Sequence, residues 1–398
     1  NLNIFKKNQL INFFEKHNIK SRNISSLKEI IEGKDLYEKI QKININELLD
    51  RRINNNIPLL NFEKKIILIT GSGGSIGSEL CNQILSLRPR KIILLDHSEY
   101  NLYKIHSDMS TYIKKDDDIE ISPVLGSVQN LPFLENLFMS NKIDYIFHAA
   151  AYKHVPLIEN NVFEAVSNNF LGTINILNLL EKYKVKNFVL VSTDKAVRPT
   201  NIMGATKRLA ELAVQAYASK VKDDSKLCIV RFGNVIGSSG SVSEIFINQI
   251  KKGGPITITH PEVTRYFMTI NEAVSLIIYS IFLSKNGEVF LLDMGKPIKI
   301  VDLAKKMVEA FDLKIKEKNN NGDIEIVFTK LRPGEKLYEE LLIGKNSSTT
   351  SNPFIKKAQE NFLDYHEFKI VEKRILNLIL EKDVKGLFEI LNSNVEGF

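Results

Sequence analysis

The sequence of 398 residues contains only two cysteines and no long apolar run. Cys81 and Cys228 lie far apart in apolar stretches, so we expect buried free thiols rather than a disulfide framework. No stretch approaches the roughly 18 apolar residues of a membrane-spanning helix. The opening residues, NLNIFKKNQLINFF, lack the small-residue cleavage site of a signal peptide. No cluster of histidine and cysteine indicates a metal site.

The chain carries a modest excess of positive charge, with 54 Lys and Arg against 47 Asp and Glu, and a net charge of +7. A basic chain suits nucleic acid, an anionic membrane surface or a phosphorylated substrate. No RNA- or DNA-binding motif accompanies the charge, so we predict no nucleic-acid partner. Apolar residues make up 43% of the chain, which is ordinary for a globular protein with a core.

Four regions of different character follow one another along the chain. Residues 1–60 are polar and helix-biased, and we interpret them as a helical remnant of a truncated domain. In residues 61–234, near-continuous apolar runs alternate with helical stretches, which indicates a parallel sheet covered on both faces. Residues 235–352 are expected to be mainly substrate-binding, with strand 288–295 returning to the sheet. Residues 353–398 are predicted to form a helical tail.

The predicted fold class is therefore α/β. We expect a Rossmann-type, doubly wound parallel sheet with a smaller, discontinuous C-terminal substrate-binding domain.

The first apolar strand runs directly into a glycine-rich stretch, ITGSGGSIGSEL. Its glycines have the spacing G-x-x-G-x-x-G between a strand and a helix, which is the context that a dinucleotide-binding loop requires. They permit a tight turn, close approach to a pyrophosphate and close helix–strand packing, while the helix directs its N–H groups at the anion. The predicted cofactor contacts in this loop are Gly71, Ser72, Gly74, Ser75, Ile76 and Gly77.

Asp96 ends the second strand, about 20 residues beyond the loop, where a carboxylate can bind the ribose 2′-hydroxyl. The same carboxylate would repel a 2′-phosphate, so the predicted cofactor is NAD rather than NADP. Arg88 and Arg90, just before this strand, argue in the other direction.

Several motifs together resemble the extended short-chain dehydrogenase/reductase superfamily over about residues 62–350. TGSGGSIG matches its nucleotide loop, HAAAYKHVPLIENN its fourth-strand region, and VSTDKAVRPTNIMGATKR its catalytic segment. THPEVTRYFMTI and LRPGEK resemble the substrate-side motifs of nucleotide-sugar 4,6-dehydratases. The sequence is most similar to the large, membrane-anchored UDP-N-acetylglucosamine 4,6-dehydratases, which include the bacillosamine-pathway enzyme of protein glycosylation.

This resemblance implies an NAD-dependent conversion of UDP-N-acetylglucosamine into UDP-2-acetamido-2,6-dideoxy-4-keto-hexose. A hydride leaves C4, water is eliminated across C5 and C6, and the hydride returns to C6. The resemblance also implies transmembrane helices outside this sequence and a location at the cytoplasmic face of the inner membrane, with the present part soluble in the cytoplasm. Pairing into homodimers or larger homo-oligomers is expected.

The resemblance further assigns the proton transfers. Asp194 would be the acid at C6 and Lys195 the base at C5, with the Thr193 hydroxyl beside them. Lys195 must be neutral to act, and we expect burial and a nearby Lys207 to lower its pKa. Lys207 is also expected to bind the nicotinamide ribose.

The superfamily carries a tyrosine four residues before Lys207, where this chain has Met203. A thioether has no exchangeable proton, so Met203 cannot take the C4 hydroxyl proton. Asp194, a water held by Thr193 and Lys207, or Lys207 itself could do so, and we favour Asp194, alone or through water. Within the resembled family, methionine here is typical of the membrane type, whose product retains the C5 configuration.

The same motifs supply further predicted contacts. Ala149 and Ala150 are expected beside the cofactor, and arginine forks suit a sugar diphosphate. A glutamate could bind a uridine ribose hydroxyl. The predicted substrate contacts are Lys153, Asn234, Arg265, Arg332 and Glu335.

Two other functions stay open. Met203 favours a catalytically silent regulator that binds NAD or a UDP-sugar. A UDP-sugar C4-epimerase shares the fold and cofactor, but it needs no acid–base pair for C5 and C6. The adjacent Asp194 and Lys195 therefore favour the dehydratase.

Overall fold

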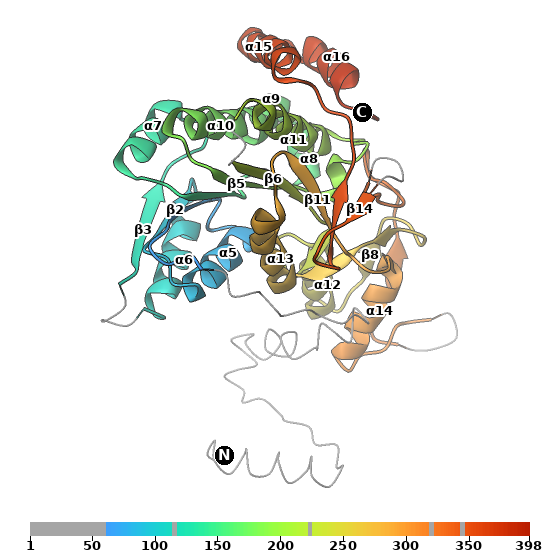
Figure 1. Ribbon diagram of the computed structural model, residues 1–398. Helices are drawn as coiled ribbons and strands as arrows, with labels where there is room; N and C mark the ends of the chain where they lie inside the picture. The colour runs from blue at the N-terminus through green and yellow to red at the C-terminus, as the bar shows by residue number, and fades with distance from the viewer. Residues whose placement is uncertain (1–60, 114–117, 222–224, 318–321, 343–346) are drawn as a thin grey trace, which may run out of the picture. The chain divides into compact units, whose positions relative to one another are not determined.

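The computed structural model describes residues 61–398, apart from 114–117, 222–224, 318–321 and 343–346. The predicted helical segment at residues 1–60 lies outside the described residues. The centre of the described part is a nine-stranded sheet in the order β14-β15-β11-β6-β5-β4-β1-β2-β3 (Figure 1).

Seven strands of this sheet run parallel, and the strand order reverses between β1 and β4. A reversal of this kind leaves a crevice outside the carboxyl ends of the strands, where doubly wound folds bind their ligands. The predicted α/β class with a Rossmann-type sheet is confirmed. The parallel strands are β1 (Ile66–Thr70), β2 (Lys91–Asp96), β3 (Glu120–Leu125), β4 (Tyr145–His148), β5 (Asn187–Val191), β6 (Lys226–Arg231) and β11 (Glu288–Leu292).

Helices cover both faces of the sheet because successive side chains of a strand point to opposite faces. In β1, Leu68 packs into one apolar cluster, while Ile67 and Ile69 pack into the other. The Ile67 face carries α5 (Ser75–Ser86), α6 (Glu99–Ser110) and α13 (Ile270–Leu283). The Leu68 face carries α7 (Leu131–Ser140), α8 (Val155–Glu159), α9 (Val162–Val166), a π-helical turn (Ser167–Leu171), α10 (Gly172–Tyr183) and α11 (Ile202–Lys220) (Figure 1).

Apart from α13 and β11, the region between β6 and residue 328 is built from short paired strands and two helices. β7 (Asn234–Ile236) pairs with β10 (Phe267–Thr269), and two further pairs form beside α12 (Val242–Lys251) and α14 (Ile300–Ala310). These pairs are β8 (Ile256–Ile258) with β13 (Ile326–Phe328), and β9 (Thr264–Arg265) with β12 (Ile298–Lys299). The predicted strand at 288–295 is present as β11, between β6 and β15 of the main sheet.

The prediction that residues 353–398 are helical throughout is wrong at their start. β15 (Ile355–Ala358) pairs antiparallel with β11, and β14 (Ser347–Thr349) extends the edge. A segment of four residues is too short for apolar periodicity to indicate a strand. The pairing of β15 with the distant β11 therefore cannot be predicted from the sequence. The helices α15 (Tyr365–Glu381) and α16 (Val384–Asn394) follow.

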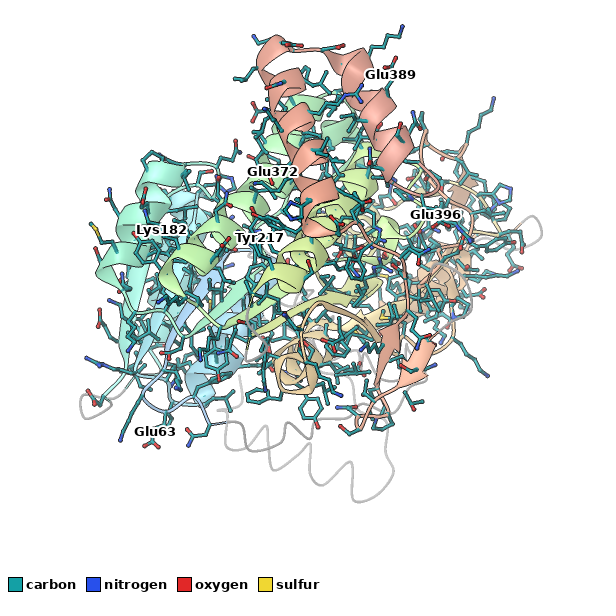
Figure 2. The ribbon with its side chains drawn as sticks, turned by 45° about the horizontal axis from the view of Figure 1, so that its top comes forward. Glu63, Lys182, Tyr217, Glu372, Glu389 and Glu396 are labelled. Carbon is teal, nitrogen blue, oxygen red and sulfur yellow. The ribbon has the colours of Figure 1, made fainter. Side chains whose placement is uncertain are left out.

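The two C-terminal helices cover α11, whose residues are buried from Ile202 to Ala218. Figure 2 shows Tyr217 of α11 and Glu372 of α15 at this interface. The Tyr217 ring lies edge-on to that of Tyr365, with 5.3 Å between the centroids. The second helix layer therefore shields the surface of α11 from solvent.

Both cysteines are buried free thiols, as predicted. No helix in the ranges that the structure describes is long and apolar enough to span a bilayer.

Candidate active site

The glycine loop joins β1 to α5 at the carboxyl edge of the sheet. Gly71 has a φ of 66°, and a Cβ there would lie 2.7 Å from the Ala150 nitrogen. At Gly77 a Cβ would lie 1.9 Å from the Gly71 oxygen, so this glycine permits the close helix packing that was predicted. Gly74 is the N-cap of α5, and no side chain in the described ranges caps the helix. An uncapped helix start with no acidic residue in its first turn fits an incoming phosphate.

One predicted loop contact is not presented to a ligand. Ser72 is completely buried, and its hydroxyl has no hydrogen-bond partner among the described residues. Its backbone N–H donates to the Leu95 oxygen, so both its backbone amide and its side chain are directed into the protein interior. Ser75 stays near the surface and accepts a hydrogen bond from the Ser239 N–H at 3.1 Å.

Asp96 is held at the end of β2 by two backbone contacts. Its Oδ2 accepts from the Gly73 N–H and its Oδ1 from the Ser98 N–H, both at 2.9 Å. The carboxylate is therefore oriented between the glycine loop and the next helix. Arg90 precedes β2 at the opposite end, and a strand rises about 3.3 Å per residue, so it lies on the order of 20 Å away. At that distance, Arg90 cannot contact a 2′-phosphate placed beside Asp96, so it does not favour NADP.

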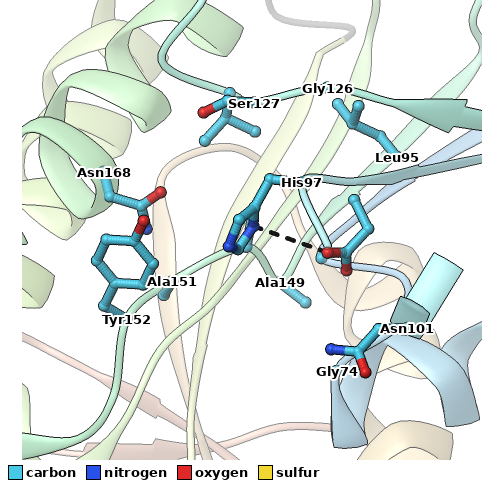
Figure 3. Close-up of a pocket in the computed structure, with 14 residues that line it drawn as sticks. Gly74, Leu95, His97, Asn101, Gly126, Ser127, Ala149, Ala151, Tyr152 and Asn168 are labelled. Carbon is cyan, nitrogen blue, oxygen red and sulfur yellow. Dashed lines mark ion pairs between the residues drawn. The ribbon is translucent and has the colours of Figure 1, made fainter. Parts of the chain in front are cut away.

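A pocket opens at this edge of the sheet, where the strand order reverses (Figure 3). The predicted Gly71, Gly74, Asp96, Ala149 and Ala150 all line it. Residues that the motif did not identify complete the wall: Leu95, His97, Asn101, Gly126, Ser127, Val128, Ala151, Tyr152 and Asn168. His97 Nδ1 lies 3.7 Å from Asp96 Oδ1, the dashed contact in Figure 3.

The catalytic candidates follow β5, in a short helical turn over Asp194–Ala196. Asp194 is fully buried, and its Oδ1 accepts from Thr193 Oγ1 and from Lys195 Nζ, both at 2.9 Å. Lys195 Nζ also donates to Asn234 Oδ1 at 3.1 Å. The predicted Asp194, Lys195, Thr193 and Asn234 therefore lie together. The second oxygen of Asp194 is buried and has no hydrogen-bond partner in the described part of the chain.

The expectation of a lowered Lys195 pKa is wrong. Burial by itself lowers the pKa of Lys195, but the carboxylates of Asp194 and Glu339 outweigh it and hold the pKa above its ordinary value. Lys195 is therefore an ammonium group in this arrangement. It is Lys207 whose pKa is lowered, to about 8, by burial, which the nearby Glu211 opposes.

Met203 and Lys207 lie on α11, which packs against the Asp194–Ala196 turn. Met203 is 4% exposed and packs into the apolar cluster on the α11 side of the sheet. Lys207 Nζ donates to the Val191 oxygen at 2.7 Å, which ties it to the end of β5. Met203 therefore packs as an apolar side chain of the core.

The predicted substrate contacts divide into residues that pair within the protein and residues that are exposed. Arg265 is buried and donates to Glu335 Oε1 at 3.4 Å and to the Thr264 oxygen at 2.7 Å. Glu335 also accepts from Thr259 Oγ1 at 2.8 Å. Arg332 and Lys153 are exposed. The two predicted residues Arg265 and Glu335 thus contact each other, which was not foreseen.

Two buried polar groups beside the site were also missed. Asn169, in the π-helical turn, accepts from the Tyr152 N–H at 2.7 Å and donates to Thr206 Oγ1 at 3.1 Å. His148 lies between two threonines, and burial and the nearby Lys207 lower its pKa to about 3. His148 opens the motif HAAAYKHVP, whereas Asn169 lies beyond it, and only packing shows the contacts of both residues.

Glu339 is the other residue that the sequence did not single out. Its side chain is 5% exposed, and its Oε1 lies 3.9 Å from Lys195 Nζ and 3.7 Å from Arg265 Nε. The site therefore holds a second buried carboxylate beside the predicted pair. Across the described residues, no group of three or more His, Cys, Asp or Glu side chains is placed to hold a metal ion.

A family model described as "Polysaccharide biosynthesis protein" matches residues 67–360. The chain belongs to this family. Among the relatives is the capsular polysaccharide biosynthesis protein CapD of Staphylococcus aureus, 44% identical over 369 residues, which cover 90% of this chain and 59% of CapD. The chain thus spans less than two thirds of that relative. A UDP-glucose 4-epimerase of Rickettsia canadensis is 37% identical over 289 residues, covering 71% of this chain and 78% of the epimerase.

Solved structures show the same fold as this member of the polysaccharide biosynthesis family. Pen from Bacillus thuringiensis has a TM-score of 0.66 and 32% identity, covering 80% of this chain and 99% of Pen. A dTDP-glucose 4,6-dehydratase from Bacillus anthracis in complex with NAD has a TM-score of 0.56 and 20% identity, covering 70% of this chain and 87% of the dehydratase. The fold is that of extended short-chain nucleotide-sugar dehydratases and epimerases.

Proposed function

We propose that the described part of this chain is an NAD-dependent UDP-N-acetylglucosamine 4,6-dehydratase that retains the C5 configuration. One observation carries the proposal: Asp194 and Lys195 are hydrogen-bonded side by side at the carboxyl end of a central strand, and one buried Asp194 oxygen has no hydrogen-bond partner among the described residues. A buried polar atom costs free energy unless something bonds to it, and a sugar hydroxyl would supply that bond.

The described residues fit NAD. Gly71 and Gly74 bring backbone close to a pyrophosphate, the uncapped start of α5 faces it, and Asp96 is oriented for a ribose hydroxyl. When bound, NAD accepts the hydride from C4 and supplies it again to C6. The NAD complex of the Bacillus anthracis dehydratase supports this cofactor.

Asp194 would serve two proton steps in succession. As a carboxylate it takes the C4 hydroxyl proton during oxidation, and as a carboxylic acid it delivers that proton to the departing C6 hydroxyl. Met203, which stands where the superfamily has tyrosine, has no proton to contribute. A single group in both steps accounts for the loss of the phenol, and the unpartnered Asp194 Oδ2 is the atom available for the transfer.

Lys195 would act at C5. The C4 ketone acidifies the C5 proton, and a neutral Lys195 amine can remove it and later return it to the same face. Asn234 and Asp194 both contact the Lys195 amine, so its position is defined from two elements. Return from the same face is what would retain the configuration.

A UDP-sugar C4-epimerase is the second candidate, because epimerases of Rickettsia are among the relatives. An epimerase returns the hydride to C4 and needs no base at C5. The contact between Asp194 and Lys195 therefore favours the dehydratase. The location at the cytoplasmic face of the inner membrane and the homo-oligomeric state stay predictions.

The deciding experiment incubates the full protein, loaded with NAD, with UDP-N-acetylglucosamine in deuterated water. A 4-keto-6-deoxy product with deuterium at C5, read by NMR, is the expected result. A C4-inverted sugar that still carries its 6-hydroxyl would instead establish the epimerase. Recovery of unlabelled substrate would instead support a catalytically silent protein that binds NAD or a UDP-sugar.

A further inference from the structure

Glu339 reaches the catalytic pair from a distant part of the chain. It follows the LRPGEK motif, and its side chain is nine-tenths buried against groups from the β5 turn and from β9. One oxygen faces Lys195 Nζ at 3.9 Å and Arg265 Nε at 3.7 Å. The other oxygen is buried with no hydrogen-bond partner among the described residues.

The proposed reaction leaves one proton without a destination. Asp194 and Glu339 keep Lys195 in its ammonium form, and an ammonium group cannot remove the C5 proton. Asp194 cannot accept the surplus proton, because it already holds the proton from the C4 hydroxyl. A further acceptor beside Lys195 is therefore required.

We propose, on the basis of the function above, that Glu339 stores the Lys195 proton during each turnover. Its carboxylate lies within reach of the Lys195 amine through a small side-chain rotation or one bridging water. Glu339 touches Lys195 and not the reacting carbons, so it is a positioning residue that acts through the lysine.

The protons balance in this scheme. Asp194 takes the C4 hydroxyl proton while the hydride leaves C4, and the Lys195 ammonium then gives one proton to the Glu339 carboxylate. The Lys195 amine removes the C5 proton as Asp194 protonates the C6 hydroxyl, which leaves as water. After the hydride reaches C6, Lys195 returns a proton to C5 and recovers its own from Glu339.

The surroundings of Glu339 suit a group that changes its charge. Burial raises the pKa of Glu339, as does Asp194, whereas Lys195, Arg265 and Lys336 lower it, and the pKa stays above its ordinary value. A carboxylate with a raised pKa accepts a proton more readily than an exposed one. Protonation of Asp194 by the substrate removes a charge that raises the pKa of both Lys195 and Glu339. The pKa of Lys195 falls more, because Asp194 contacts its amine directly at 2.9 Å, so the proton moves toward Glu339.

The test compares Glu339→Gln and Glu339→Asp with Glu340→Gln in the full protein loaded with NAD. Glu340 is the next residue, is exposed, and pairs with Arg198 at 3.0 Å outside the site. Two readouts separate the steps: the absorbance of enzyme-bound NADH after one addition of UDP-N-acetylglucosamine, and the incorporation of solvent deuterium at C5.

We expect Glu339→Gln to form NADH at the wild-type rate but to make product about 100-fold more slowly. This factor is at the lower end of the rate loss that follows removal of a proton-transfer group. NADH should accumulate and C5 labelling should slow. Raising the pH should partly restore turnover in this variant alone, because solvent then removes the lysine proton. Glu339→Asp should be intermediate with the wild-type pH profile, and Glu340→Gln should match the wild type.

Equal losses of NADH formation and product in Glu339→Gln, or full activity of the variant, would overturn the proposal. If Glu339→Gln does not fold, the ratio of NADH formed to product formed is measured in Glu339→Asp, and the same criterion applies. Failure of the proposed function looks different, because the wild-type protein itself would then form neither NADH nor a 4-keto product.

Discussion

Asp194, Lys195 and Glu339 place two negative charges and one positive charge in a mostly buried site. The ammonium of Lys195 compensates both carboxylates, and its own protonation is in turn maintained by them. Each proton that moves in the proposed reaction therefore changes the acidity of the other two groups. In the proposed reaction, this mutual dependence would allow the three side chains to act in sequence without a tyrosine.

Lys195→Ala is expected to lower product formation by a factor of about 10² to 10⁴, the usual contribution of a general base. NAD should stay bound, because Lys195 does not line the cofactor pocket. Product is measured by NMR, and bound NAD is measured by chromatography after denaturation. The exposed Lys252→Ala is the control. Wild-type turnover in Lys195→Ala would remove this lysine from the mechanism.

Met203→Leu tests whether the methionine has a chemical role. The side chain is buried in an apolar cluster, so a swap of similar volume should cost less than about 1.5 kcal/mol and leave activity nearly unchanged. Met203→Tyr should instead overpack the site and cost about 1–3 kcal/mol without raising activity. Urea unfolding and steady-state rates check both variants. A large activity loss in Met203→Leu would show that the sulfur matters.

Among the secondary-structure elements, α11 is a helix buried on both sides. It lies between the sheet and α15, and it carries both Met203 and Lys207. Its burial keeps the Lys207 amine out of water, which is the main reason that the pKa of Lys207 falls. α15 packs on this helix through Tyr365 and Tyr217, so it helps to shield from solvent the helix that carries Lys207.

Phe368→Ala tests how firmly α15 is attached. Phe368 is fully buried, with its ring edge-on to Phe170 at 6.1 Å, so removal should cost about 3–5 kcal/mol of unfolding free energy. Phe362 is 51% exposed just before the helix, and its replacement by alanine should stay within about 0.5 kcal/mol. Denaturant unfolding measures both. Equal effects would mean that α15 does not pack as described.

The strand elements show which parts of the fold were predictable. β1 and the start of α5 were identified because an apolar run, a glycine spacing and a helix follow one another within a few residues. The sequence predicts a helical tail where β15 lies, because nothing in four residues reveals that β11 offers an open edge. The site divides in the same way: Asp194 and Lys195 are neighbours in sequence, whereas Glu339 reaches them only through folding.

In the molecule as a whole, a buried ion cluster connects segments far apart in the sequence. Arg231 of β6 is completely buried and contacts Glu211 of α11 and Glu360, which follows β15. Arg208 joins the same two carboxylates. Burial by itself raises the pKa of Glu211, but the arginines outweigh it and lower the pKa to about 2.

This cluster predicts a loss of stability in acid. Between its ordinary pKa of 4.5 and the folded value of about 2, Glu211 binds a proton in the unfolded chain but not in the folded one. The contribution of Glu211 to the free energy of unfolding is therefore complete above pH 4.5 and is lost as the pH falls toward 2. Urea unfolding at a series of pH values measures it.

Glu211→Gln should lose about 3–5 kcal/mol at neutral pH, because the buried Arg231 then keeps Glu360 but loses the charge of Glu211, and it should show a weaker dependence on acid. Glu181→Gln removes a partly exposed pair with Lys220 and should cost less than about 1 kcal/mol. An unchanged acid profile in Glu211→Gln would exclude this carboxylate as the source.

The sequence by itself determined the α/β class, the dinucleotide loop and the adjacent acid and amine, because each is a local pattern whose spacing the covalent chain maintains. Only the tertiary structure decided the charge of Lys195, the pairing of Arg265 with Glu335 and the second carboxylate of the site. A pKa depends on every charge within a few ångströms and on exclusion of water. Both are set by segments that only folding brings together.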